Sequence, residues 1–319
     1  MKFYPITFFP IIKERIWGGT KLQEFLNKTL EIHNAGESWE ISNVSNSVSI
    51  ANNGVLKGKS LSEIIDLYPE EILGKKVMSI YGKEFPLLFK FLDSKHDLSI
   101  QLHPNGALAK KRHNSFGKTE MWYVLQADKD ARIVVGFKEN STQKEYLRHL
   151  EDKTVVSLLD EIPVKKGDVF LLETGTIHAI GAGILIAEIQ QTSDVTYRIY
   201  DWDRVDAEGK ERELHTDLAL DAINYNKVES KIDYPIIGNK KNSIVENTYF
   251  TTNIIPLDGI YEWDKTKDVF TVLMCTEGSF SLTIDNEVFY YKKGDTVLIP
   301  AIIDAFFMQG NASVLEISI

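Results

Sequence analysis

The sequence has a single cysteine, Cys275, so no disulfide can form within the chain. Scarce cysteine fits a reducing compartment, and the apolar neighbours of Cys275 in FTVLMCT predict a buried, unreactive thiol. No run approaches the roughly 20 apolar residues that a membrane-spanning helix needs. The first residues lack the layout of a signal peptide, because prolines interrupt their apolar stretch and charges follow it. We therefore expect a soluble, cytoplasmic protein.

Positive charge is also scarce. There are 36 Lys and Arg residues against 46 Asp and Glu residues, which gives a formal net charge of −10 at pH 7. No basic cluster and no basic helix-turn-helix segment interrupts this pattern, so the sequence argues against nucleic acid and anionic membranes as partners. A small anionic substrate would need cations of its own at the site. No feature specifies an oligomer, and we expect a monomer.

What the sequence has in quantity is short runs of β-branched and aromatic residues. Hydrophobic residues make up 43% and aromatic residues 11% of the 319 residues, enough for a packed core and more typical of two domains than of one. The strand-like runs fall into two blocks, within 85–203 and 250–319, bounded by Gly, Asn and Asp. Helical spacing is found at 61–73, with Ser60 as a plausible N-cap, and at 142–162 and 213–224.

Short strands with tight turns in two blocks predict an all-β protein with two jelly-roll barrels and a few short decorating helices. The polar segment 224–235 reads as the connection between the blocks. We expect a catalytic N-terminal domain at 1–230 and a metal-free C-terminal domain at 231–319.

The two blocks contain matching segments. KKGDVFLLETGTIHA at 165–179 aligns with KKGDTVLIPAIIDAF at 292–306, which places His178 opposite Ala305. One copy therefore keeps a histidine after the turn and the other has lost it. This difference predicts one active barrel and one structural barrel.

Polar residues also occur where the pattern predicts a buried strand. In SIQLHP at 99–104, Gln101 and His103 are two positions apart, so both face the same way in an extended strand. Glu120 opens another strand and His178 follows the turn described above. Two imidazoles, a carboxylate and an amide suit zinc, or else manganese, iron or cobalt. The alternative is that each is an ordinary core residue with hydrogen-bond partners.

Several segments together resemble type I mannose-6-phosphate isomerases of the cupin superfamily, in their short bacterial form. GDVFLLETGTIH is similar to the second cupin motif, with Glu173 in place of the usual proline. The other similar segments are PLLFKFLD with LSIQLHP, GKTEMWYVL, IAEIQQTSDVTYRIYDWDR, RIWGGTKL and GESWEIS. The resemblance covers most of 10–205 and, more faintly, the C-terminal block. It implies two cupin barrels and a metal-dependent interconversion of mannose 6-phosphate and fructose 6-phosphate.

The resemblance also implies roles for particular residues. It implies one zinc ion per chain, with the metal ligands Gln101, His103, Glu120 and His178. It further implies substrate-phosphate contacts at Ser99 and Lys118, a catalytic arginine at Arg198, and acidic proton-transfer groups at Glu188 and Asp194.

The sequence departs from the family pattern near these positions. The family's His-Lys-Pro-Glu is 117–120 here, reading Gly-Lys-Thr-Glu, so a proposed catalytic histidine is missing. The Ala-Gly-Leu-Thr that follows the arginine in longer members is 199–202 here, reading Ile-Tyr-Asp-Trp, and His-Ala-Tyr becomes His-Ala-Ile at 178–180.

Three charged residues have structural alternatives. Arg198 lies in an apolar strand, where it could form a salt bridge with Asp194 or Asp201 instead of acting in catalysis. Glu188 is flanked by Ile and Ala, so burial would raise its pKa toward the range of a general base, or it could pair with Arg198. Lys118 could be a surface lysine.

Aromatic and histidine side chains outside this set carry less weight. Trp17 and Trp39 could line a sugar pocket or be core residues. The histidines at 33, 96, 113, 149 and 215 are expected at the surface. Two other functions remain open: an iron-dependent cupin oxygenase, which would have an open metal face without phosphate-binding cations, and a sugar-binding cupin with a structural metal.

Overall fold

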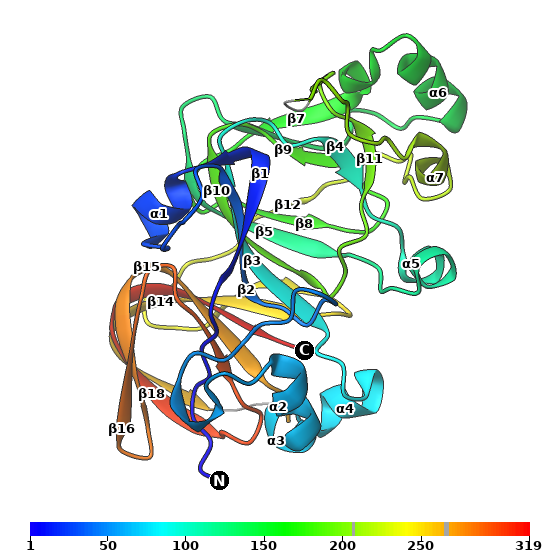
Figure 1. Ribbon diagram of the computed structural model, residues 1–319. Helices are drawn as coiled ribbons and strands as arrows, with labels where there is room; N and C mark the ends of the chain where they lie inside the picture. Colours follow the sequence, from blue (N-terminus) through cyan, green and yellow to red (C-terminus); the bar gives the residue numbers. More distant parts are fainter. Residues whose placement is uncertain (206–207, 265–267) are drawn as a thin grey trace.

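The computed structural model describes residues 1–205, 208–264 and 268–319, and in it two β units are stacked end to end (Figure 1). Antiparallel strands dominate and the helices are short, which confirms the expected all-β class. No helix among the described residues is long and apolar enough to cross a membrane.

The N-terminal unit is a sandwich of two sheets. The larger sheet contains, in spatial order, β1 (Ile11–Gly19), β2 (Ala35–Ile41), β3 (Leu87–Ser94), β10 (Ile184–Gln191), β5 (Glu120–Ala127), β8 (Val169–Leu172) and β12 (Lys231–Ile232). The smaller sheet contains β11 (Tyr197–Tyr200), β4 (Ile100–Leu102), β9 (His178–Ile180), β6 (Arg132–Phe137) and β7 (Leu159–Pro163).

The C-terminal unit is one strongly curled sheet, the orange and red strands of Figure 1. Its order is β13 (Asn242–Glu246), β14 (Thr251–Asp264), β18 (Ala305–Ser318), β15 (Thr271–Ile284) and β16 (Glu287–Lys292), with β17 (Thr296–Ile299) paired to β15. Three of its strands are 14 residues long, so each can follow the curl of the sheet.

The matching segments form the same turn in both units. The aspartate closes each turn by accepting from the backbone N–H three residues earlier, at 3.0 Å in 165–168 and at 2.8 Å in 292–295. Gly167 and Gly294 have φ of 89° and 91°, which a side chain would strain. β8 and β17 then begin at equivalent positions, and so do β9 and β18. The alignment drawn from sequence is therefore a structural repeat.

The helices lie at the sides of the two units: α1 (Lys21–Leu26), α2 (Leu61–Leu67), α3 (Pro69–Leu73), α4 (Lys75–Tyr81), α5 (Gly106–His113), α6 (Gln143–Glu151) and α7 (Thr216–Leu220). Ser60 is the N-cap of α2 and forms a capping box with Glu63, as expected. The pattern at 61–73 forms two helices, because Pro69 cannot continue α2 and starts α3.

The pattern at 142–162 is helical only in its first half. It continues as a 3-10 turn at Val155–Leu158 and as β7, so the longer helix expected there is wrong. β7 pairs with β6, and this tertiary pairing overrides the local helical spacing.

The two units share their largest hydrophobic cluster. Phe85 and Phe89 of the N-terminal unit belong to it together with Phe270 and Leu315 of the C-terminal unit, and the Phe85 and Phe270 rings lie 4.7 Å apart. β12 pairs with β8 of the N-terminal unit, and the first strand of the C-terminal sheet begins at Asn242. The division at residue 230 stays a proposal, and these strands place the connection between Ile232 and Asn242.

Candidate active site and metal centre

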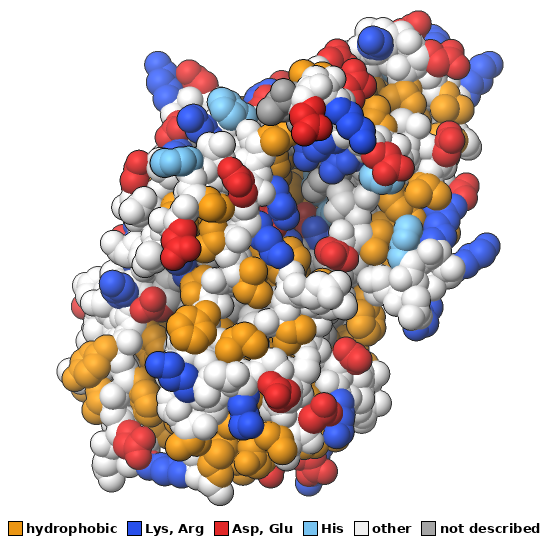
Figure 2. Space-filling model, viewed as in Figure 1, with side chains coloured by type: hydrophobic (Ala, Val, Ile, Leu, Met, Phe, Trp, Pro, Cys, Tyr) orange, Lys and Arg blue, Asp and Glu red, His pale blue; other side chains and the backbone are white. Residues whose placement is uncertain are grey.

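A cavity of about 400 Å³ opens between the two sheets of the N-terminal unit. Figure 2 shows the molecule hollowed between β1 and β11, with Lys and Arg side chains gathered there. The charged residues on its wall are the cations Arg15, Lys90, Lys118, Arg198 and Arg212 and the carboxylates Glu37, Glu188 and Asp194. Cations are in excess here although the whole chain is acidic. The site therefore carries the local positive charge that an anionic substrate requires.

The smaller sheet brings three of the expected site residues into one row. Arg198 on β11 lies opposite Gln101 on β4, and Gln101 lies opposite His178 on β9. Residues directly opposite on antiparallel strands point to the same face, so all three side chains belong to one wall of the cavity. Strand register thus unites residues that are far apart in the sequence.

The larger sheet contributes a facing row. Trp39 lies opposite Lys90, Lys90 opposite Glu188, and Glu188 opposite Trp122, across β2, β3, β10 and β5. Glu120 shares the face of Trp122 because it is two residues earlier on β5. The carboxylates expected from sequence, Glu188 and Glu120, therefore face the Gln101 row from the opposite sheet.

His103, Glu120 and His178 form a compact group, with one ligand-type atom of each lying within 4.8 Å of the others. The Nε2 atoms of the two histidines each lie 3.5 Å from a different oxygen of Glu120. The Nδ1 atoms lie near backbone carbonyls, 2.8 Å from Val195 for His103 and 2.9 Å from Thr176 for His178. A carbonyl only accepts, so Nδ1 carries the proton and Nε2 offers its lone pair toward Glu120.

This group is buried and leaves polar atoms without hydrogen bonds. Oε1 of Glu120 and Nε2 of His178 are fully buried and have no hydrogen-bond partner, and Oε2 of Glu120 has only the Lys118 ammonium, at 3.0 Å. Such unpaired atoms cost roughly 1–3 kcal/mol each, and more for a charged carboxylate. A divalent cation bound by His103, Glu120 and His178 would satisfy them together. The donor set therefore fits a metal, and Gln101 is the neighbour able to add an amide oxygen.

Ionisation states in the group support the same interpretation. Burial and the nearby Lys118 ammonium lower the pKa of His103 to about 3, and burial lowers the pKa of His178. Burial alone would raise the pKa of Glu120, but Lys118 and His103 outweigh it and hold that pKa well below its usual value. Near neutral pH the group is two neutral imidazoles and a carboxylate, the forms that bind metal.

Lys118 is buried and not a surface lysine. Its Nζ lies 3.0 Å from Glu120 and 3.2 Å from Nε2 of His103. Burial would lower the pKa of Lys118, but the Glu120 and Glu188 carboxylates outweigh this effect and raise it. The ammonium therefore stays charged beside the ligand group.

Arg198 is the cavity cation without a carboxylate partner. Its Nε lies 3.3 Å from Oγ of Ser99 and its Nη1 donates to the Glu213 carbonyl at 2.7 Å. Within the described chain no carboxylate lies at ion-pair distance from Arg198. Asp201 instead pairs with Arg204 and Arg212. The salt-bridge alternative for Arg198 is therefore wrong.

Burial, and then repulsion from Arg212, lower the pKa of Arg198. Both effects disfavour its charge, so an anion in the cavity would relieve them. An anion bound in the cavity would therefore stabilise the charged guanidinium.

Glu188 pairs with Lys90. The alternative from the sequence, a pair between Glu188 and Arg198, is wrong. Its oxygens lie 2.9 Å from Nζ of Lys90 and 3.1 Å from Nε1 of Trp122. The pairing follows from register, since both partners are its direct cross-strand neighbours. Glu188 is therefore a fixed carboxylate that faces the cavity.

The remaining expected residues lie at the same cavity. Ser99 is buried between Arg198 and Gln101, and Asp194 is exposed at the edge of the cavity. Trp17 and Trp39 also line it.

The sequence analysis did not single out Lys90, Glu37, Arg212 or His215. Burial opposes the charge of Glu37, but Lys90 and Arg15 outweigh it and lower its pKa to about 2. His215, expected at the surface, is half-buried. Its Nδ1 accepts a hydrogen bond from the backbone N–H of Arg198 at 3.2 Å, and its own backbone N–H donates to the Arg198 carbonyl at 2.7 Å. A lysine in the middle of the apolar run FPLLFKFLD was the available signal for Lys90.

The N-terminal sandwich and the curled C-terminal sheet are the two β barrels of a cupin protein, and the first barrel holds a buried His-Glu-His group that could bind a metal. Family patterns identify the particular kind. Residues 7–146 match "Phosphomannose isomerase type I, catalytic domain", and residues 240–319 match "Mannose-6-phosphate isomerase, cupin domain".

Individual proteins agree over nearly the full length. The chain is 38% identical to the mannose-6-phosphate isomerase ManA of Bacillus subtilis (strain 168), over 97% of this chain and 96% of that protein. It is 36% identical to the mannose-6-phosphate isomerase of Streptococcus mutans, over 95% and 94%. The crystal structure of a mannose 6-phosphate isomerase from Bacillus subtilis superposes with a TM-score of 0.91 at 34% identity, covering 99% of both chains. The chain belongs to the type I phosphomannose isomerase family.

Proposed function

We propose that this chain interconverts mannose 6-phosphate and fructose 6-phosphate in the cavity of its N-terminal barrel. The reaction moves a proton between C1 and C2 of the open-chain sugar and needs a base, stabilisation of a developing oxyanion, and a phosphate contact. The observation that carries the proposal is that His178 of the His-Glu-His group, a fixed carboxylate and an unpaired guanidinium lie on the walls of one 400 Å³ cavity. The curated relatives bear the name of this activity.

We propose zinc as the resident metal, held by His103, Glu120 and His178 with Gln101 as the fourth ligand. Imidazole and carboxylate ligands with one amide suit zinc. When bound, such a metal acts as a Lewis acid toward the sugar oxygens at C1 and C2. The carbonyls of Val195 and Thr176 hold the two imidazole rings in place, which fixes the orientation of their Nε2 atoms.

Glu188 is the proposed base. Its carboxylate is held by Lys90 and by the Trp122 indole, so it faces the cavity in one orientation. A base held in place can take the proton from one carbon and return it to the neighbouring carbon of the same bound sugar. Asp194, at the exposed edge, is proposed to help the proton reach a sugar oxygen.

Ser99, Lys118 and Arg198 are the proposed contacts for negative charge. Arg198 carries the unpaired guanidinium, and Ser99 lies within hydrogen-bond distance of it. The Lys118 ammonium lies beside the ligand group and on the cavity wall, where it is proposed to contact the phosphate. Arg198 is then left to stabilise the oxyanion that develops at C1 or C2.

The further properties of the protein follow from composition and burial. We propose a 1–230 catalytic domain and a 231–319 domain without metal, in a monomer that works in the cytoplasm. Burial raises the pKa of the Cys275 thiol to about 12, as suits the unreactive thiol expected from the sequence. The acidic net charge supports the absence of nucleic acid and anionic membranes as partners.

The test is a coupled assay of mannose 6-phosphate conversion on metal-stripped protein, before and after zinc is added, with unphosphorylated mannose as the parallel substrate. We expect activity only with metal, and far more of it on the phosphorylated sugar. If metal binds while no isomerisation occurs on either sugar, the proposal is wrong, and the oxygenase and sugar-binding alternatives take its place.

A further inference from the structure

β11 is the last strand of the smaller sheet, and among the described strands it pairs only with β4. Its other side carries the segment 212–215 and the helix α7, which Figure 1 shows beside it. Arg198, whose side chain reaches the active-site cavity, belongs to this strand. The contacts along the second side of β11 therefore decide how firmly Arg198 is held.

His215 bonds to both main-chain groups of Arg198. The Arg198 N–H donates to Nδ1 of His215 at 3.2 Å, and the His215 N–H donates to the Arg198 carbonyl at 2.7 Å. One residue thus satisfies the donor and the acceptor that a strand at the edge of a sheet leaves open. The backbone of β11 is fixed at the residue whose side chain enters the cavity.

The guanidinium of Arg198 has only neutral acceptors. Nη1 donates to the carbonyl of Glu213, two residues before His215, at 2.7 Å, and Nε donates to Oγ of Ser99 at 3.3 Å. Neutral acceptors hold a guanidinium less strongly than a carboxylate does. The direction of this side chain therefore depends on where β11 and the segment 212–215 place its backbone and its carbonyl acceptor.

The imidazole of His215 is not used by the helix that it precedes. His215 is the N-cap of α7, yet its side chain makes no capping hydrogen bond. N-caps are usually Ser, Thr, Asp or Asn, whose side-chain oxygens accept from the first N–H groups of the helix. Here the side chain directs its acceptor nitrogen to Arg198 on the neighbouring strand instead.

The imidazole is in the form that this hydrogen bond requires. Nδ1 accepts, so the ring is neutral and carries its proton on Nε2. Burial lowers the pKa of His215, and the charges of Arg198 and His113 add to this effect against the opposing Glu213 carboxylate. The ring also packs against Tyr197, with 6.3 Å between the ring centres. Near neutral pH the acceptor nitrogen is therefore available to Arg198.

We propose that His215 is a positioning residue for Arg198: it holds the backbone of β11 so that the guanidinium stays directed into the cavity. In the reaction proposed above, this guanidinium stabilises the oxyanion that develops at C1 or C2. A displacement of about 1 Å in such a group can lower a rate by about 10²-fold. The effect of His215 on the rate rests on that proposed reaction, whereas its effect on the backbone rests on the hydrogen bonds alone.

The experiment removes the acceptor and then restores it, in the zinc-loaded full chain. His215→Phe keeps a ring against Tyr197 but has no acceptor, and His215→Ala is a second variant without an acceptor in case His215→Phe does not fold. His215→Asn brings an acceptor back, because its side-chain oxygen takes about the place of Nδ1. His113→Phe is the matched control, since Nε2 of His113 lies 2.9 Å from the Tyr197 hydroxyl and no described hydrogen bond joins His113 to Arg198.

Two quantities are measured on every variant. NMR gives the rate of hydrogen exchange at the Arg198 amide, and steady-state assays give kcat and KM for mannose 6-phosphate, with thermal unfolding as the folding check. In His215→Phe we expect this amide to exchange at least about tenfold faster. We expect kcat to fall about 10–100-fold with KM within about twofold of its original value. His215→Asn should bring both back to within about threefold of the unmodified protein, and His113→Phe should change neither.

Three results would overturn the proposal: unchanged exchange at Arg198 in His215→Phe, a loss of thermal stability in that variant with kcat unchanged, or an amide protected again in His215→Asn without recovery of kcat. The exchange measurement needs no turnover. An unmodified chain that does not isomerise mannose 6-phosphate would therefore count against the proposed reaction, and the exchange rates would still decide whether His215 holds Arg198.

Discussion

The two barrels are built on the same plan down to single strand pairs. Glu120 pairs with Leu172 in the first barrel, and Thr271 pairs with Ile299 at the equivalent place in the second. Each barrel also buries a glutamate on the equivalent strand, Glu188 in β10 and Glu316 in β18. The scaffold alone therefore does not decide which barrel has a site.

The difference lies in how the buried polar groups are satisfied. Glu316 accepts from Lys241 at 2.7 Å, from the Asn253 amide at 2.7 Å and from the Trp263 indole at 2.8 Å. Glu120 has no donor on Oε1, and on Oε2 it has only the Lys118 ammonium at 3.0 Å, which also lies 3.2 Å from Nε2 of His103. A buried carboxylate with three donors is fully satisfied within the protein, whereas Glu120, with one shared donor, leaves an oxygen that a ligand could satisfy.

The equivalent place in the second barrel is apolar. Ala305 replaces His178 and Thr271 replaces Glu120, while Trp263 and Phe306 stack at 4.5 Å inside a continuous apolar cluster. Polar groups in the first barrel keep a cavity open, and apolar side chains in the second barrel fill the equivalent region. The comparison teaches that function in this fold depends on unpaired polar groups in the interior.

The largest effect should come from the metal ligands. Glu120→Gln removes the charge that holds the cation, and we expect isomerase activity to fall by more than about 10⁴-fold, since the metal contributes several kcal/mol to stabilising the oxyanion. Thr271→Val, at the equivalent position of the second barrel, should leave activity unchanged. Steady-state assays measure the activity of both variants, and circular dichroism checks that both are folded. Equal losses of activity in the two variants would contradict the assignment of catalysis to the first barrel alone.

The paired glutamates give the next test. Glu188→Gln should lower kcat by roughly 10²–10⁴-fold with little change in stability, as for loss of a general base. Glu316→Gln should leave kcat intact but destabilise the fold by roughly 1–3 kcal/mol, because it leaves Lys241 without its ion pair and Trp263 with a weaker acceptor. Urea denaturation and kinetics on both variants measure the two effects. Reversed outcomes would show that the roles of the carboxylates are misassigned.

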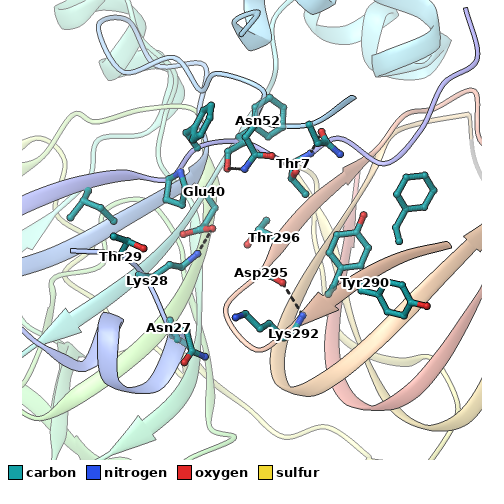
Figure 3. Close-up of a pocket in the computed structure, with 18 of the residues that line it drawn as sticks. Thr7, Asn27, Lys28, Thr29, Glu40, Asn52, Tyr290, Lys292, Asp295 and Thr296 are labelled. Atoms are coloured by element: carbon teal, nitrogen blue, oxygen red, sulfur yellow. Dashed lines mark hydrogen bonds and ion pairs between the residues drawn. The ribbon is translucent and has the colours of Figure 1, made fainter. Parts of the chain in front are cut away.

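A smaller effect on KM should show that only the cations of the active-site cavity matter for substrate binding. Arg212→Gln removes a cation from the active-site wall, and we expect KM for mannose 6-phosphate to rise about tenfold with kcat nearly unchanged. Lys292→Gln removes a cation from a separate cavity of about 820 Å³, lined by residues of both units (Figure 3), and should alter neither constant. A fall in kcat for Arg212→Gln would instead place Arg212 in the chemistry.

The smallest effect concerns Asp93 in the first barrel, whose equivalent position in the second barrel is Pro256. Burial raises the pKa of Asp93 to about 6, although the Lys21 N–H partly offsets this. The folded chain thus keeps a proton that the unfolded chain loses near pH 4, so Asp93 costs stability as pH rises from about 4 to 6. Asp93→Asn should gain roughly 1–2 kcal/mol over the unmodified protein between pH 4 and pH 7.

Denaturation midpoints across that pH range provide the measurement for Asp93. Asp258→Asn, an exposed carboxylate on β14, is the control and should show no such gain. A stability difference that stays flat with pH would show that Asp93 ionises normally in the folded protein.

Local patterns in the sequence predicted much of this molecule. Alternation placed Gln101 and His103 on an inward face, and the repeated turn predicted that Ala305 would replace His178 in the second barrel. Both depend on residues close in the chain, where period and turn geometry are fixed by the backbone. The capping box at Ser60 is a further example.

Long-range register could not be obtained in this way. Glu188 lies opposite Lys90 only because β10 pairs with β3 in one register, and a shift of one residue would turn both side chains away from the cavity. The same holds for Arg212, which reaches the site from an irregular segment by pairing with Asp201. The sequence predicted which polar residues gather at one cavity better than it predicted the partners of those residues.

The central claim is that one barrel binds a metal and catalyses while the other serves as structure. Titration of metal-stripped protein with zinc, with mannose 6-phosphate conversion followed at each step, tests it most directly. The account predicts that activity rises to its maximum at one equivalent of zinc per chain, and that His178→Ala takes up none and stays inactive. Maximum activity only at two equivalents, or tight uptake of one equivalent by His178→Ala with activity retained, would contradict it.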